Sequence, residues 1–95
     1  MVLKLKLSQK SIRGKTARLS NWRIRGDVIV KNFEFLDFAE AMRFVNRVAK
    51  LAEAANHHPD ITINYNRVRL ALTTHDEGGL TEKDFRLAGK INKLN

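Results

Sequence analysis

The stretch from Asp37 to Ala55 constrains the fold most, because it predicts one long amphipathic helix. Asp37 and Glu40 form the D-x-x-E pattern of a helix start, in which side chains cap free backbone N–H groups. Apolar residues then recur at helical spacing, and they are Phe38, Ala41, Met42, Val45, Val48, Ala49, Ala52 and Ala55. Such a helix needs a sheet or another helix to cover its apolar face.

Two β-hairpins are predicted around this helix. Residues 22–35 alternate around Gly26-Asp27, whose leading glycine suits a type II′ turn. The apolar phase changes before Phe33, which leaves open a bulge near residues 31–32 or burial of both strand faces. Residues 61–72 alternate around Tyr65-Asn66 and predict two half-buried strands, with Tyr65 serving packing rather than chemistry.

Shorter helices are expected at both ends of the chain. Ser8 can cap a helix that runs to about Arg18, and Thr81 with Asp84 begins a last helix. The predicted order is helix, two strands, helix, two strands, helix. We therefore expect an α+β fold of two layers, a four-stranded antiparallel sheet with the helices packed on one face.

The composition limits the class of protein. Ninety-five residues allow one domain, taken as residues 1–95, and the absence of cysteine excludes disulfides, thiolate catalysis and cysteine zinc sites. No apolar run approaches the roughly 20 residues that cross a bilayer, and the first residues alternate lysine with apolar side chains, unlike a signal peptide. We expect a cytoplasmic protein without membrane association.

The net charge of +8 is concentrated at the N-terminus, in an arm that we take as residues 1–21 together with the strand after it. Eight basic residues and no acidic residue precede Asp27, whereas the remaining chain carries equal numbers of each. A solvated basic helix explains this better than a nucleic-acid site, because Trp22 is the arm's single aromatic residue. Only weak, sequence-independent nucleic-acid binding at low salt is expected, since phosphate contacts carry no sequence information.

All three histidines of the chain surround the second hairpin. Pro59 ends the long helix and disfavours helical geometry at His58, so His57 and His58 leave it in different directions. His75 follows the second strand of the hairpin and can return toward the helix end. Because an unperturbed imidazole titrates at about 6.5, this cluster indicates acid–base chemistry.

Two other chemistries fit the residues less well. Three imidazoles can bind zinc, but adjacent histidines rarely aim at one ion, and the sequence has no H-x-H or H-x₃-H pair. A nucleophilic triad lacks a suitable serine, because no serine follows Ser20. Gly78-Gly79 is a lone pair and not a phosphate-binding loop.

At these residues the chain resembles the pterin-4a-carbinolamine dehydratases. The signature positions are spaced as Glu53-x₃-His57-His58-Pro59-x₅-Tyr65-x₉-His75-x₈-Asp84. The likeness extends from Trp22 to Ile91 and includes NFEFLDFAEAMRFVNRVAKLAE and THDEGGLTEKD. It implies a two-layer α+β fold, a homotetramer built as a dimer of dimers, no cofactor and no metal.

The resemblance also implies a reaction and its residues. The reaction is dehydration of a 4a-hydroxytetrahydropterin to a quinonoid dihydropterin, as in the recycling of tetrahydrobiopterin-type cofactors. It needs an acid at the leaving oxygen and a base near N5. His57, His58 and His75 are implied as the catalytic, pterin-contacting set, with His58 and His75 as the proton-transfer pair.

Four further residues take supporting roles by the same likeness. Asp84 would orient His75 or fix its loop, and Glu53 would position His57 from one helical turn away. Thr74 and Asp76 would bind the amide and amino edge of the pterin.

Two features lie outside the resemblance. Ile61 replaces a bulky aromatic residue found in some relatives, so one wall of the pterin pocket is expected to differ, and the basic arm is unexplained. Animal relatives also serve as dimerisation partners of a homeodomain transcription factor. A non-catalytic binding module, for protein or nucleic acid, therefore remains the alternative function.

Overall fold

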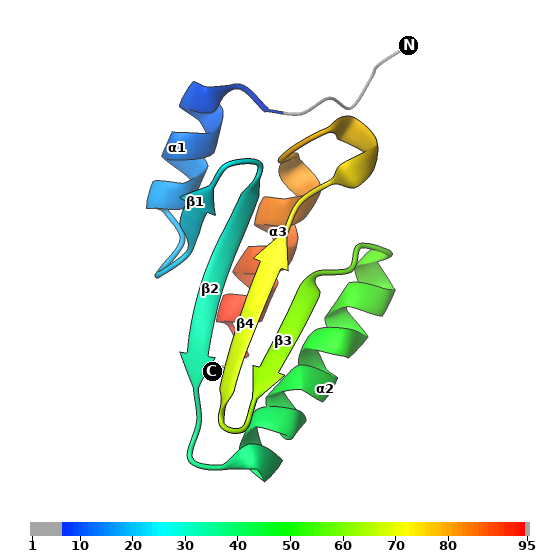
Figure 1. Ribbon diagram of the computed structural model, residues 1–95. Helices are drawn as coiled ribbons and strands as arrows, with labels where there is room; N and C mark the ends of the chain where they lie inside the picture. The colour runs from blue at the N-terminus through cyan, green and yellow to red at the C-terminus, as the bar shows by residue number, and fades with distance from the viewer. Residues whose placement is uncertain (1–6, 95) are drawn as a thin grey trace.

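The computed structural model describes residues 7–94, and they form a four-stranded sheet with three α-helices (Figure 1). Lys4 and Lys6 of the basic arm lie outside these residues. The elements in chain order are α1 (Gln9–Ala17), β1 (Arg23–Arg25), β2 (Val28–Glu34), α2 (Phe38–Ala55), β3 (Asp60–Asn64), β4 (Arg67–Leu72), the 3-10 turn η1 (His75–Glu77) and α3 (Glu82–Asn92).

The sheet is antiparallel throughout, with strand order β1-β2-β4-β3. Both predicted hairpins are present, closed by Gly26-Asp27 and by Tyr65-Asn66. Gly26 has a positive φ of 60°, which the first central position of a type II′ turn requires. The central pair, β2 and β4, brings the two halves of the chain together (Figure 1).

One sheet face carries the core. On β2 and β4 the side chains of Ile29, Phe33, Val68, Leu70 and Leu72 point to that face and are buried. They pack against the apolar sides of α2 and α3, and Ile12 of α1 joins the same cluster. The two-layer α+β fold with helices on one face is therefore confirmed, in the predicted order.

The change of apolar phase in β2 reflects burial on both faces and not a bulge. Pairing with β4 runs without interruption from Ile29 to Glu34. Val30 is buried on the face opposite the core beside Ala71. Lys31 occupies a core-facing position, where its Nζ donates to Asn92 Oδ1 at 2.8 Å, and burial lowers its pKa.

Helix α2 begins as predicted, with the Asp37 carboxylate accepting the backbone N–H of Glu40 at 2.9 Å. Its buried side is narrower than the apolar pattern indicated. The buried residues are Ala41, Phe44, Val45, Val48 and Ala52. The expectation that Phe38, Ala49 and Ala55 also face the core is wrong, because all three side chains are exposed. Phe38 is the first residue of the helix, and periodicity alone cannot tell an exposed alanine from a buried one.

Strand β3 departs from the prediction of a half-buried strand, because all five of its residues are exposed. Ile61 and Ile63 do share the core face with their partners Leu70 and Val68, yet they remain 36% and 38% exposed. The reason is the strand's place at the sheet edge, which the helices do not fully cover. Tyr65 is 64% exposed at the turn, so its interpretation as a packing residue is wrong.

Replacing Leu70 with alanine should lower the free energy of unfolding by about 2–5 kcal/mol, because the fully buried side chain would leave a cavity. The control is Thr62→Ala on the exposed face of the neighbouring strand, which should lower the free energy of unfolding by less than about 1 kcal/mol. Urea denaturation of both variants measures the difference. Equal effects would contradict the assignment of the core face.

Candidate active site

Three segments meet at one end of the sheet: the C-terminus of α2, the loop after β4 and the N-terminus of α3. Helix α2 ends at Ala55 and is capped by Asn56, which adopts a left-handed conformation with φ 51° and donates its N–H to the carbonyls of Ala52 and Glu53. His57 and His58 follow directly. Strand β4 leads through Thr73 and Thr74 into η1, which His75 begins.

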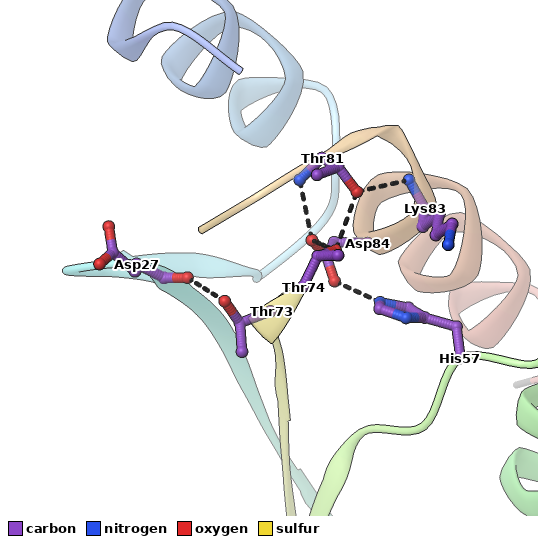
Figure 2. A network of polar contacts seen from close by, with 7 residues as sticks. All are labelled: Asp27, His57, Thr73, Thr74, Thr81, Lys83 and Asp84. Atoms are coloured by element: carbon purple, nitrogen blue, oxygen red, sulfur yellow. Dashed lines mark hydrogen bonds and ion pairs between the residues drawn. The ribbon is translucent and has the colours of Figure 1, made fainter. Parts of the chain in front are cut away.

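The centre of the site is a buried carboxylate, Asp84, which is 0% exposed. Its Oδ2 accepts hydrogen bonds from the Thr74 hydroxyl and from the Thr81 N–H, both at 2.9 Å (Figure 2). Its Oδ1 lies 2.6 Å from His57 Nε2. Thr81 and Asp84 form the capping box of α3, so the residue that starts the helix also holds a histidine.

His57 is fixed by this contact. Its side chain is only 11% exposed. An ionised carboxylate can only accept, so His57 Nε2–H donates to Asp84 and, in the neutral ring, Nδ1 is left as the acceptor. Of the two roles expected for Asp84, it does not orient His75, because its Oδ1 points to His57 (Figure 2). It does help to fix the His75 loop, because its Oδ2 accepts from the hydroxyl of Thr74.

His58 pairs with Glu53, not with the buried network. Its Nε2 lies 2.6 Å from Glu53 Oε2, and both side chains are largely exposed. Helical spacing predicts that Glu53 lies beside His57. That spacing does not apply, because α2 ends at Ala55 and the left-handed Asn56 turns the chain, which leaves His58 beside the glutamate.

His75 is exposed and has no side-chain hydrogen bond to another residue within 7–94. Its loop is held by backbone bonds between Thr74 and Gly79, with N···O distances of 3.1 and 3.3 Å. The Thr74 hydroxyl is committed to Asp84 and also lies 2.8 Å from Thr81 Oγ1. The loop thus presents an unpaired imidazole on an anchored backbone.

A cavity of about 370 Å³ joins these groups. It is lined by Asn56, His57, His58, Thr73, Thr74, His75, Asp76 and Lys83. The structure therefore brings together all three predicted catalytic residues and both predicted substrate contacts. A larger hollow of about 480 Å³ lies on the sheet near Arg67 and Arg69, and no histidine lines it.

Three lining residues were not found by sequence reasoning: Asn56, Thr73 and Lys83. Asn56 could have been found as a left-handed helix cap, since asparagine tolerates that conformation. Thr73 bonds through its hydroxyl to the carbonyl of Asp27 at 2.6 Å, which ties the loop to the first hairpin (Figure 2). No sequence signal distinguished Lys83 from other surface lysines.

The described part of the chain shows neither a metal cluster nor a membrane-spanning helix. Within residues 7–94, no three histidine, aspartate or glutamate side chains converge as a metal site needs. None of the helices in that range is both long and apolar enough to traverse a bilayer.

The family model for pterin 4 alpha carbinolamine dehydratase matches residues 5–94. The chain belongs to the pterin-4a-carbinolamine dehydratase family. The members of this family are hydro-lyases, so the chain is an enzyme of that class by homology.

Individual pterin-4a-carbinolamine dehydratase relatives agree with this assignment. A chain from Thermomicrobium roseum, provisionally named a pterin-4-alpha-carbinolamine dehydratase, is 52% identical over 94% of this chain and 96% of its own length. The crystal structure of a "transcriptional coactivator/pterin dehydratase" from Brucella melitensis has a TM-score of 0.89 at 35% identity, covering 94% and 97% of the two chains. A pterin dehydratase-like protein identified as a RuBisCO assembly factor in the alpha-carboxysome has a TM-score of 0.66 at 26% identity. The match covers 78% of this chain and 88% of that protein's chain.

Proposed function

We propose that this chain dehydrates a 4a-hydroxytetrahydropterin to the quinonoid dihydropterin by histidine acid–base catalysis. The C4a–O bond breaks as the oxygen takes a proton and leaves as water. N5 loses its proton and the C4a=N5 double bond forms, so the reaction is balanced without an oxidant. The observation that carries the proposal is one cavity lined by His57, His58 and His75.

The roles follow from how each imidazole is held. His58 and His75 are exposed at the cavity, and we assign them proton transfer to the leaving oxygen and from N5. His57 is locked to Asp84, so it suits contact with the pterin in a fixed orientation. Glu53 orients His58. Asp76 and the backbone of Thr74 suit the amide and amino edge of the ring.

The test is a stopped-flow absorbance trace of a synthetic 4a-hydroxytetrahydropterin with the purified protein, recorded with and without a chelator. We expect faster dehydration than in buffer and the same rate with the chelator. Loss of the acceleration with the chelator would support a zinc site instead.

The exposed edge strand supports self-association, and we propose a dimer or tetramer. Every residue of β3 is exposed, and an unpaired strand edge with Ile61 and Ile63 beside it is a surface that folded proteins usually cover. Light scattering should therefore show an oligomer at micromolar concentration. A monomeric mass there would contradict this expectation.

The alternative is a non-catalytic binding module that uses the basic arm. It is favoured by the Brucella melitensis structure, which is named a transcriptional coactivator as well as a pterin dehydratase, and by the exposed bases of α1 and β1. Lys15 is already paired with Glu82 at 2.6 Å, which reduces the charge left for phosphates. A sequence-selective DNA complex that survives physiological salt in a competition gel-shift would favour the module over the enzyme.

A further inference from the structure

A second hollow adjoins the histidine cavity along α3. Its volume is about 170 Å³, and it is lined by Ala55, His57, Lys83, Arg86, Leu87 and Lys90. His57 and Lys83 line both hollows, so the His57 ring stands between two neighbouring compartments. We call the second compartment the basic hollow.

The basic hollow is strongly cationic. Positions 83, 86 and 90 lie on one side of α3, and their three side chains are exposed cations. No acidic residue lines the hollow. The ion pairs found within residues 7–94 involve Lys15, His57 and His58, so Arg86 and Lys90 have no carboxylate partner in that range.

The chemistry of the ring connects the two compartments. In a pterin, C6 is bonded to N5 and carries the variable side chain. If the C4a–N5 bond lies at the histidines, as the proposed function requires, the C6 substituent leaves the ring within two bonds of the reacting atoms. The larger compartment, about 370 Å³, takes the bicyclic ring, and the adjoining 170 Å³ has room for a small polar group.

We infer that the C6 side chain of the substrate passes His57 and ends in the basic hollow with an anionic group, a phosphate ester or a carboxylate. This inference rests on the proposed dehydration. A neutral polyol can accept hydrogen bonds from Arg86 and Lys90, but it carries no charge that pairs with theirs. Guanidinium and ammonium groups bind phosphate and carboxylate through charge-assisted hydrogen bonds, which are stronger than neutral ones.

The test compares three substrates that share the 4a-hydroxytetrahydropterin ring. One carries 6-hydroxymethyl, the other its phosphate ester, and a third with 6-carboxymethyl separates phosphate from carboxylate recognition. We expect kcat/KM for an anionic substrate to exceed that of the alcohol by about tenfold, equal to about 1.4 kcal/mol, mainly through KM. The ratio should fall as salt increases.

Variants locate the effect. In the double variant Arg86→Gln/Lys90→Gln, the ratio of kcat/KM for the anionic substrate to kcat/KM for the alcohol should fall to about one. Arg13 is a cation on α1 outside both hollows, so Arg13→Gln should leave this ratio at its wild-type value. Equal kcat/KM for the alcohol and both anions in the wild type would overturn the inference while leaving the dehydratase in place. If no substrate is turned over, the dehydratase proposal fails, and fluorescence titration with oxidised 6-hydroxymethylpterin and its phosphate decides the inference by the same ratio of affinities.

Discussion

Alanine at His58 or at His75 is expected to lower the dehydration rate by about 10²-fold or more, because each imidazole is assigned one proton transfer. Both side chains are exposed, so the variants should fold as the wild type does. Stopped-flow rates at saturating substrate measure the effect, and thermal denaturation checks the fold. Glu53→Gln is the matched control for His58, since it changes the partner and keeps the imidazole.

The size of the loss separates chemistry from structure. If Glu53→Gln lowers the dehydration rate much less than His58→Ala does, the proton transfer belongs to the histidine itself. Rates within about threefold of the wild type for both alanine variants would remove these histidines from the proton-transfer steps.

Asp84→Ala is expected to lower the free energy of unfolding by about 3–5 kcal/mol, because the buried donors of His57, Thr74 and Thr81 would lose their acceptor together. A domain of this size is stabilised by only about 5–15 kcal/mol in total, so the loss is large. Urea denaturation gives the value. Activity should fall too, since His57 loses the contact that fixes its ring.

The control for this change is Asp37→Ala, which removes the carboxylate that caps α2. A single helix cap contributes about 1 kcal/mol to stability, so this variant should lower the free energy of unfolding several-fold less than Asp84→Ala does. Similar losses for the two would mean that Asp84 serves only as a helix cap. Asp84→Asn, which keeps the shape, should retain more stability than Asp84→Ala.

The fold could be predicted from sequence because its local signals agree with one another. The start of α2 is signalled by Asp37, the first hairpin turn by Gly26-Asp27, and the end of α2, to within a few residues, by Pro59. The structure has all three features. The exposure of β3 could not be predicted in the same way. Alternation shows which residues share a face, whereas the position of a strand in the sheet depends on contacts between distant segments.

In the candidate site, too, local features could be predicted from sequence and contacts between distant segments could not. The three histidines were found from their types and spacing, and one cavity contains them all. The histidine partner of each carboxylate was predicted wrongly: Glu53 contacts His58 and not His57, and Asp84 contacts His57 and not His75. The pairing of His57 with Asp84 spans 27 residues and depends on the left-handed turn at Asn56, so helical spacing could not predict it. Lys83 and its neighbours on α3 have no local signal, and only the packing of α3 beside His57 gives them a place near the site.

The most direct test of dehydration by this chain is product formation with the protein at a small fraction of the substrate concentration, in metal-free buffer. Substoichiometric protein separates catalysis from simple binding of the pterin. We predict that the quinonoid dihydropterin forms faster than in buffer alone and in molar excess over the protein. A trace that coincides with the buffer trace at every protein concentration would contradict the account.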